Sequence, residues 1–464
     1  MENKKILILG AGYTGLAAAI ELNKSKVETH IVEKSDKAGG LSQTITLSDI
    51  KFELGPHIYF DKDTEVTAFW RDLVGDKFKS YERNNRIFYN GKFIKSPLSV
   101  WDTLFKLGPF SVISIIWSFI IAKIFRKRPI NSAEDWVKAN FGNQLFERFF
   151  KVYNEKIWGI KSSEISPNWA GQRIKSSLTT MVVKSLKKEH EFIIKTFDFP
   201  DGGSESIYNA QLNILNKAEN VHLKYNCVAT KISPSGSGFI VDFSNGEKGI
   251  YFSNIISSIH LSDLSKTLVG FPEVALNTLN NAINKLMYRN LVLVNLVFHK
   301  NEVKNFKEHW IDIHDPSITA LRVTNFGNYN FGLSNSEKSG VGLEYNCFES
   351  EDIWTMSDEK IIEIALADLN KMGLIQDKPI DFSVIKLAKA YPIYFNAFEK
   401  QTEAIFSELI KIKGLELAGR NSMYKWNNMH HSVKTGILAA RNCLGSKNNL
   451  FEVKGMVSIG KDSD

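Results

Sequence analysis

The first forty residues constrain the fold of this chain more than any other segment. An apolar run, Ile6–Leu9, leads into the spacing Gly-x-Gly-x-x-Gly at Gly10, Gly12 and Gly15. A second apolar run stops on Glu33-Lys34, and the pair Gly39-Gly40 follows. This order predicts a strand, a tight turn, a helix and a second strand. Such a unit is typical of the start of an α/β sheet that binds a dinucleotide.

Each part of this motif has a physical role in such a site. Gly10 makes the turn, Gly12 lets the backbone approach a pyrophosphate, and Gly15 lets the helix pack closely on the sheet. The helix then begins at Tyr13 and Thr14, where unpaired N–H groups and the positive end of the helix dipole face the phosphates. Glu33 can accept hydrogen bonds from an adenosine ribose. A structural βαβ unit without ligand is the alternative, but spacing, acid and position together favour a dinucleotide.

Two further segments favour FAD over NAD. Ala38–Ser42, with Gly39, Gly40, Leu41 and Ser42, resembles the extended fingerprint of FAD-binding amine oxidases and glutathione-reductase-like flavoproteins. Near the other end, Leu415–Arg420 is expected to form a buried strand that ends at Gly419, and Ser432–Cys443 a helix. In that superfamily the last strand and helix close the site around the flavin. The resemblance therefore implies an FAD site whose two halves lie at opposite ends of the chain.

The predicted fold class is α/β with a discontinuous, Rossmann-like FAD-binding domain. We expect this domain to comprise residues 1–70, 195–262 and 400–464, with strands over 221–232 and 250–259 rejoining its layers. Residues 71–194 should form a mainly helical insertion. Residues 263–399 should form an antiparallel-sheet substrate domain, because four β-rich runs lie between 291 and 348. At 464 residues the chain is long enough for such interleaved domains.

Composition excludes several classes of protein. The net charge is +7, but there is no Arg/Lys-rich nucleic-acid module, so we predict no nucleic-acid partner. Cys227, Cys347 and Cys443 are widely spaced and contain no Cys-x-x-Cys motif. They therefore indicate neither a disulfide framework nor a metal site. A strand begins within five residues of Met1 without a signal-peptide-like apolar region, so we predict a cytoplasmic location.

Residues 109–128 allow two interpretations. The apolar run Pro109–Phe125 is followed by Arg126-Lys127-Arg128 and is interrupted by Lys123. It is shorter than the roughly 20 residues that span a membrane. A buried helix of the substrate domain is the favoured prediction. A peripheral membrane contact is the alternative, with apolar side chains among headgroups and the basic cluster near anionic lipid.

Further along, the chain resembles the UDP-galactopyranose mutase family of flavoenzymes. The likeness is carried in order by Leu54–Phe60 with its Gly55-Pro56-His57, by Tyr153–Gly159 with its Tyr-x-x-Lys-x-Trp-Gly pattern, by Arg173-Ile174, by Phe199–Gly203 and by Gly419–His430. The run from Trp310 to Glu344 looks equally like protoporphyrinogen-oxidase-type relatives. The resemblance spans most of the chain and places it in the amine oxidase and protoporphyrinogen oxidase-like superfamily.

The resemblance implies a pyranose/furanose isomerisation of a nucleotide-linked sugar for surface polysaccharide. In that family the reduced flavin acts through N5, and cationic side chains hold the diphosphate. The residues implied in catalysis are His57, Arg322, Arg173, Trp158 and Tyr391. The residues expected to bind FAD are Gly10, Gly12, Tyr13, Thr14, Gly15, Glu33, Lys34, Gly39, Gly40, Leu41, Ser42, Gly55, Pro56, His57, Val228, Gly419, Arg420, Asn428, Met429, His430 and Ser432.

Three departures from the family pattern leave other functions open. Ser177 stands where a diphosphate-clamping arginine is expected, Phe60 replaces a histidine, and Asn428-Met429-His430 replaces Asp-Met-Asp. The alternative is an FAD-dependent oxidoreductase of the protoporphyrinogen oxidase or amine oxidase type that dehydrogenates a small or apolar substrate. A flavin-containing binding protein without turnover is a third possibility. The oligomeric state is not predicted.

Overall fold

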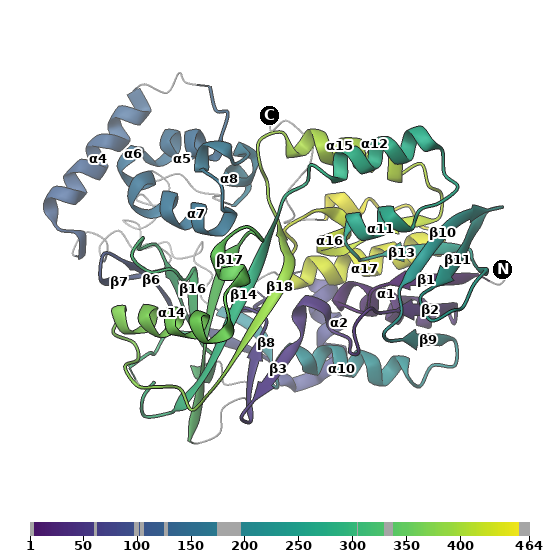
Figure 1. The fold of residues 1–464 in the computed structure, drawn as a ribbon, viewed down its shortest axis with the longest axis horizontal. Helices are drawn as coiled ribbons and strands as arrows, with labels where there is room; N and C mark the ends of the chain where they lie inside the picture. Colours follow the sequence, from purple (N-terminus) through teal and green to yellow (C-terminus); the bar gives the residue numbers. More distant parts are fainter. Residues whose placement is uncertain are drawn as a thin grey trace.

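The computed structural model describes residues 4–59, 63–96, 102, 106–124, 129–173, 196–303, 305–328 and 337–453. It has two parts that lie side by side, an α/β part around the N-terminus and a larger antiparallel sheet flanked by helices (Figure 1). Within these described ranges, no helix is long and apolar enough to cross a membrane.

A five-stranded parallel sheet forms the core of the α/β part, in the order β19-β13-β1-β2-β9. Its strands are β1 (Lys5–Leu9), β2 (Glu28–Val32), β9 (Val221–Lys224), β13 (Asn254–Ser257) and β19 (Leu415–Leu417). They come from the beginning, the middle and the end of the chain. The predicted assembly from discontinuous segments is therefore confirmed.

Both faces of this sheet are covered, which explains the uninterrupted apolar run in β1. Ile6 and Ile8 pack in one cluster with helices α1 (Tyr13–Lys24), α10 (Ser204–Leu215) and α17 (Met429–Cys443). Leu7 and Leu9 pack in another cluster with a three-stranded antiparallel sheet on the opposite face. Successive strand residues alternate between faces, so one short strand serves two cores.

The three-stranded sheet consists of β10 (Ala229–Ser235), β11 (Gly238–Phe243) and β12 (Ile250–Phe252). Residues 221–232 and 250–259 are therefore not single strands, as the sequence predicted, because each range is divided between two sheets. At the first break Asn226 has a φ of 50°, and the next residue, Cys227, donates its N–H to the Glu33 carbonyl. A left-handed residue cannot continue a strand, so the chain turns there.

The second part is a seven-stranded sheet in the order β18-β14-β17-β16-β15-β6-β7, in which only β15 and β6 pair in parallel. Its strands are β6 (Asn85–Tyr89), β7 (Lys92–Lys95), β14 (Tyr288–His299), β15 (Trp310–Ile313), β16 (Arg322–Asn325), β17 (Lys338–Cys347) and β18 (Asp381–Pro392). The four predicted β-rich runs are all present. Strands β6 and β7 lie within the range predicted to be helical, so that range contributes to the sheet as well.

Other elements link the two parts. Helix α14 (Asp358–Lys371) packs on one face of the seven-stranded sheet, and the hairpin of β3 (Thr44–Leu47) and β4 (Ile50–Glu53) packs on the other. A ribbon of β5 (Phe78–Glu82) and β8 (Thr196–Pro200) leads to α10, and α2 (Thr64–Val74) packs against α10 and α17. Two further helices, α12 (Glu273–Ile283) and α15 (Phe398–Leu409), pack on each other.

Five helices form a separate layer beside the sheet, at the left of Figure 1. They are α4 (Pro109–Ile124), α5 (Ala133–Phe141), α6 (Asn143–Leu145), α7 (Lys151–Trp158) and α8 (Pro167–Arg173). The favoured prediction that α4 is a buried helix is wrong, because Ile115 is its only buried residue. Its hydrogen bonds to the neighbouring helices are made by Ser114 and Ser118, which therefore lie on the side that faces the protein.

Candidate active site and cofactor cleft

A cavity of about 1030 Å³ lies between the two parts of the molecule. Its walls come from the loops after β1 and β2, from the start of α17, and from strands β14, β15, β16 and β18 of the large sheet. The carboxyl ends of parallel strands are where ligands bind in open α/β sheets. The cavity is large enough for a dinucleotide and a small substrate.

Glycines form the wall at the α/β end. A Cβ on Gly15 would lie 2.0 Å from the Gly10 carbonyl oxygen, so the helix can approach the strand only because residue 15 lacks a side chain. Gly12 makes a parallel bridge with Gly39. A Cβ on Gly12 would have no neighbour nearer than the Gly40 Cα at 3.8 Å. A side chain there would therefore fill the cavity without disturbing the fold.

The polar groups at this end fit a dinucleotide. Helix α1 begins at Tyr13 with no side-chain cap on its N-terminus, so its first N–H groups and positive dipole end are open to a pyrophosphate. Glu33 is buried, and its two carboxylate oxygens accept hydrogen bonds from the N–H of Ala11 at 2.8 Å and of Ser35 at 2.9 Å. Each oxygen keeps a second lone pair for a ribose hydroxyl.

The C-terminal segment closes the same end of the cavity. Asn428, Met429 and Ser432, at the start of α17, line its wall and add a second helix N-terminus. A Cβ on Gly436 would lie 2.2 Å from the Thr14 carbonyl oxygen, so α17 touches the backbone of α1. Our sequence analysis missed Gly436. Its signal was an isolated glycine inside a helical pattern, which points to close packing.

The structure brings most of the predicted FAD-binding residues to the cavity wall. Those that line it are Gly10, Gly12, Tyr13, Thr14, Glu33, Lys34, Gly39, Gly40, Leu41, Ser42, Gly55, Pro56, His57, Val228, Arg420, Asn428, Met429 and Ser432.

Three predicted FAD-binding residues lie behind this wall. Gly15 packs on Gly10, and a Cβ on Gly419 would lie 2.5 Å from the Thr14 hydroxyl oxygen. His430 is buried, with its ring centroid 5.3 Å from that of Tyr59 and 4.0 Å from that of His431. These three residues therefore hold the wall in place and do not line the cavity.

At the other end of the cavity, Arg322 on β16 is surrounded by acidic and hydroxyl groups. Its Nε donates to Asp312 at 2.9 Å, its Nη1 lies 3.3 Å from a Glu344 carboxylate oxygen, and its Nη2 lies 3.4 Å from the Tyr153 hydroxyl. Burial lowers the pKa of Arg322, but the carboxylates of Glu344 and Asp312 outweigh burial and raise it above its usual value. Burial also raises the pKa of Glu344, although Arg322 opposes this. Arg322 is thus charged and already paired.

His57 is held by a buried carboxylate. Its Nδ1 lies 3.3 Å from Glu53 Oε2. The other oxygen of Glu53 accepts hydrogen bonds from the Thr44 hydroxyl at 2.9 Å and from the Ser204 N–H at 2.9 Å. Glu53 is therefore fixed from three sides, and the imidazole of His57 is oriented within the cavity wall.

Tyr391 and Trp426 stack on each other as an aromatic wall of the cavity, with ring centroids 4.6 Å apart and an angle of 22° between their planes. The guanidinium of Arg420 lies 5.1 Å from the Tyr391 ring and donates to the carbonyls of Asn427 and Ala390. Burial lowers the pKa of Arg420. The N–H groups of Arg420 are thus bound by carbonyls of the two backbone segments that carry Tyr391 and Trp426.

One of the predicted catalytic residues, Trp158, does not line the cavity, and the side chain of another, Arg173, is outside the described residues. Trp158 is fully buried, with its ring centroid 5.0 Å from Trp426 and 5.3 Å from Trp169. The aromatic core surrounds Trp158, so it cannot contact a substrate directly, as a catalytic residue would. Arg173 is the last residue of α8, and Ser177 and Phe60 are outside the described residues.

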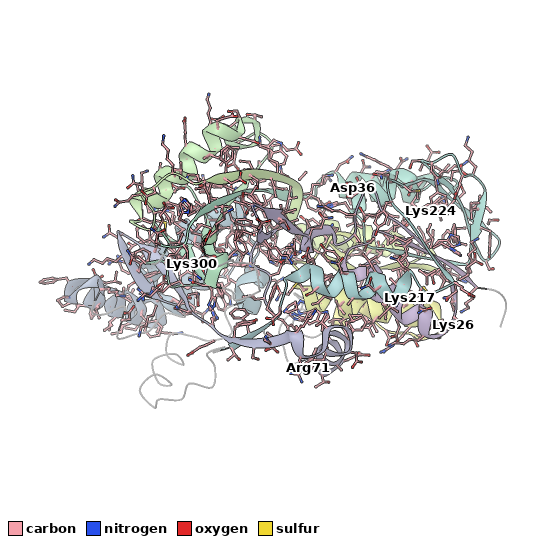
Figure 2. The ribbon with its side chains drawn as sticks, turned by 90° about the horizontal axis from the view of Figure 1, so that it is seen from below. Lys26, Asp36, Arg71, Lys217, Lys224 and Lys300 are labelled. Atoms are coloured by element: carbon pink, nitrogen blue, oxygen red, sulfur yellow. The ribbon has the colours of Figure 1, made fainter. Side chains whose placement is uncertain are left out.

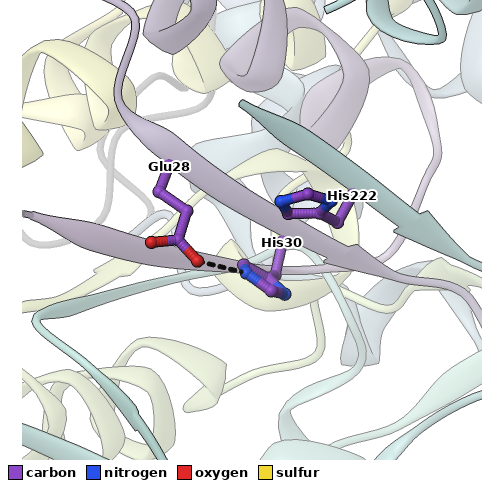
Figure 3. A group of neighbouring side chains, drawn as sticks. All are labelled: Glu28, His30 and His222. Carbon is purple, nitrogen blue, oxygen red and sulfur yellow. Dashed lines mark hydrogen bonds and ion pairs between the residues drawn. The ribbon is translucent and has the colours of Figure 1, made fainter. Parts of the chain in front are cut away.

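Glu28, His30 and His222 form a group of potential metal ligands on β2 and β9 (Figure 3). Glu28 Oε1 lies 2.9 Å from His30 Nε2 and also 2.9 Å from Lys5 Nζ. The lysine ammonium already occupies the cation position beside this carboxylate. The geometry is therefore explained by a cross-strand ion pair.

Comparison with known proteins gives a family match and several relatives. The family model for flavin containing amine oxidoreductases matches residues 13–444. A probable UDP-galactopyranose mutase of Klebsiella pneumoniae is 25% identical over 173 residues, which is 36% of this chain and 44% of that protein. Coproporphyrinogen III oxidase of Staphylococcus aureus is 23% identical over 288 residues, which is 55% of this chain and 61% of that protein. The chain therefore matches less than two thirds of the length of either.

Solved structures match over nearly the whole chain. A reduced UDP-galactopyranose mutase superposes with a TM-score of 0.82 and 20% identity, covering 96% of this chain and 94% of that one. A putative protoporphyrinogen oxidase from Exiguobacterium superposes with a TM-score of 0.74 and 16% identity, covering 95% and 99%. At these identities the likeness establishes the fold.

Proposed function

The chain belongs to the family of flavin containing amine oxidoreductases and its cofactor is FAD, and from this premise we propose that it rearranges a nucleotide-linked sugar between pyranose and furanose forms. The product of this rearrangement would be used in the biosynthesis of a surface polysaccharide. The proposal rests on the resemblance of its motifs to UDP-galactopyranose mutases and on the whole-chain likeness to a reduced mutase.

The charge of the cavity wall is the observation that carries this proposal. Among the described lining residues, six are lysine or arginine and three are aspartate or glutamate, and when Glu344, which pairs with Arg322, is counted as well, an excess of two positive charges remains. The cationic residues are Lys34, Arg83, Lys266, Arg322, Lys386 and Arg420, and the acidic ones are Glu33, Asp263 and Asp312. An excess of cations suits a substrate that brings a second diphosphate beside that of FAD.

When FAD is bound in its reduced form, it supplies a nucleophile that requires no net redox change. The residues of the chain bind and orient the substrate around it. Tyr391 and Trp426 offer a flat face to the sugar. His57, fixed by Glu53, holds or moves a proton at its ring nitrogen. Arg322 lines the cavity and can donate to an anionic group, while the Tyr153 hydroxyl donates to Asp312 at 3.1 Å and accepts from Arg322.

One observation favours a second candidate, an FAD-dependent oxidoreductase with a small, uncharged or apolar substrate. The charge of Arg322 is already balanced by Asp312 and Glu344, so its attraction for a diphosphate is reduced. Among the similar proteins, a coproporphyrinogen III oxidase and several carotenoid desaturases carry the names of oxidoreductases.

Anaerobic product analysis distinguishes the two candidates. The holoenzyme, reduced with dithionite, is incubated with UDP-galactose, and its pyranose and furanose forms are separated by chromatography. The proposal predicts isomerisation by the reduced enzyme, none by the oxidised enzyme and no consumption of an electron acceptor. Bleaching of the oxidised flavin by a porphyrinogen or a diamine, together with an inert reduced enzyme, would assign the oxidoreductase instead.

We also propose a cytoplasmic location for the enzyme. Cys227, Cys347 and Cys443 are buried free thiols, as expected in a reducing compartment. A reducing compartment also favours the reduced flavin. Localisation of a tagged chain by cell fractionation tests this proposal.

A further inference from the structure

Helix α4 turns its apolar side away from the protein. The large side chains on this outer stripe are exposed by 87% at Phe110, 64% at Ile113, 52% at Ile116, 63% at Trp117, 41% at Ile120 and Ile121, and 68% at Ile124. They recur at intervals of three and four residues, so they form one continuous face. Folded chains rarely expose a continuous apolar patch of this kind unless it binds something.

The side of the same helix that carries Ser114, Ile115 and Ser118 faces the protein. The Ser118 hydroxyl accepts a hydrogen bond from the Gln144 N–H at 3.1 Å, and the Ser114 hydroxyl lies 3.5 Å from Arg148 Nη2. A Cβ on Gly142 would lie 2.8 Å from the Phe119 nitrogen, so the backbones of α4 and the α5–α6 turn are in close contact. These contacts fix the rotation of the helix. The helix cannot turn the exposed Ile113, Ile116 and Ile120 inward without breaking these contacts.

The position and length of α4 limit what can cover this stripe. Both views place the helix at the far end of the molecule, away from the cavity (Figures 1 and 2). Charged side chains such as Lys26, Lys217 and Lys224 project around the opposite end (Figure 2). At 1.5 Å per residue, sixteen residues extend about 24 Å, less than the roughly 30 Å hydrocarbon core of a bilayer. The helix can therefore lie on a membrane but cannot cross it.

The charge on α4 indicates which kind of lipid surface the helix would bind. No acidic residue occurs in α4, and Lys123 lies in its last turn. The sequence then continues with Arg126-Lys127-Arg128, which lie outside the described residues, and the whole chain carries a net charge of +7. An apolar stripe with an interfacial tryptophan and nearby cations is complementary to an anionic lipid headgroup layer.

We propose that α4 docks the holoenzyme on an anionic lipid bilayer, with its axis in the membrane plane and the stripe around Phe110, Ile113, Trp117 and Ile124 at the boundary of headgroups and acyl chains. This docking is independent of the reaction at the flavin. It would hold the enzyme at the membrane surface through the end of the molecule that lies away from the cavity.

Vesicle flotation of the flavin-loaded enzyme tests the proposal. The wild type should float with phosphatidylcholine vesicles that contain phosphatidylglycerol and should remain in solution with phosphatidylcholine alone. Phe110→Ser, Ile113→Ser and Trp117→Ser combined should lower partition by at least about tenfold. The matched control is Val274→Ser with Ile410→Ser, because these apolar residues are exposed by 79% and 81% elsewhere. Flavin absorbance verifies that each variant is folded.

Tryptophan fluorescence gives a second readout that needs only a conservative change. Anionic vesicles should shift the wild-type emission to shorter wavelength, and Trp117→Phe should abolish most of this shift while partition remains. The proposal is wrong if the wild type does not float, if neutral vesicles bind it equally, or if the triple variant floats like the wild type. It is also wrong if the triple substitution converts a dimer into a monomer without any vesicle binding, since a second copy would then cover the stripe.

Discussion

The two ends of the cavity are built by different means. The cofactor end consists of glycines and backbone groups from short motifs, with Gly12 and Gly40 against each other and Glu33 anchored by two N–H groups. The substrate end consists of charged side chains on three consecutive strands, β15, β16 and β17, centred on Arg322 with Asp312 and Glu344. At the first end the absence of side chains defines the site. At the second, charge balance among side chains defines it.

This difference has a consequence for function. A backbone cradle binds the invariant part of the ligand, the dinucleotide, and tolerates little change. A cluster of ion pairs can be changed by one substitution at a time, and under the proposed function it would select the substrate. Two relatives with different named activities can therefore share this fold.

The largest effect is expected at the charge cluster. Arg322→Met should lower the free energy of unfolding by about 3 kcal/mol, because it leaves the buried Glu344 and the partly buried Asp312 without their cationic partner. Denaturant unfolding measures this. The matched control is Lys151→Met, whose ion pair with Glu147 is exposed by 45% and 41% and should contribute less than about 1 kcal/mol. Equal effects of both substitutions would show that the cluster has no structural role.

The cofactor end should respond in binding and not in folding. Gly12→Val should weaken FAD binding by at least about a hundredfold, or about 2.7 kcal/mol, because the new side chain would fill the cavity. Its backbone φ of −77° is compatible with valine, so circular dichroism should remain that of the wild type. Flavin titration of the apoprotein gives the affinity. Unchanged affinity would mean that the cofactor lies elsewhere.

His314 tests how completely water is excluded from the protein interior at the substrate end. Burial lowers the pKa of His314 to about 4, and its ring stacks on Tyr153 at 4.3 Å. The unfolded chain takes up the proton near pH 6.5 but the folded chain does not, so stability falls as the pH drops from about 6.5 to about 4. Between about pH 7 and pH 5 the wild type should lose about 2 kcal/mol more than His314→Gln.

Denaturant unfolding across this pH range measures the difference. His222→Gln serves as the control because His222 is exposed. Parallel pH profiles of the wild type and His314→Gln would contradict the burial of this imidazole.

The smallest effect sharpens the comparison most. Glu344→Gln removes one of the two negative charges on Arg322 and should raise the affinity for UDP by about tenfold, or about 1.4 kcal/mol. Burial raises the pKa of Glu344. Acidification that begins to protonate Glu344 should therefore strengthen UDP binding in the wild type but not in the variant. Isothermal titration calorimetry measures both. Weaker binding by the variant would show that Glu344 supports the anion and does not compete for Arg322.

The cofactor end was predictable from sequence because its determinants are local. The spacing of Gly10, Gly12 and Gly15 states where the turn and helix begin, and the positions predicted for FAD mostly line the cavity. Gly436 was missed because its partner, Thr14, is more than four hundred residues away in sequence. Sequence spacing contains no information about such a contact.

The substrate end and the helical layer were harder to predict because their contacts depend on how elements pair and pack, which sequence spacing does not state. Arg322 was recognised as a candidate, but its pairing with Asp312 and Glu344 depends on strand register between β15, β16 and β17. Trp158 was assigned to ligand binding because an aromatic residue in a motif gives no sign of its burial. Helix α4 was expected to be buried because apolarity alone does not say which side of a helix faces the protein.

The most direct test asks whether the two ends form one site. Anaerobic titration of the reduced holoenzyme with UDP-galactose, followed by flavin absorbance, should give a saturable spectral change, with a lower half-saturation concentration for Glu344→Gln. A fully flavin-loaded enzyme whose spectrum stays unchanged at every UDP-galactose concentration would contradict the assignment of a nucleotide-sugar site beside the flavin.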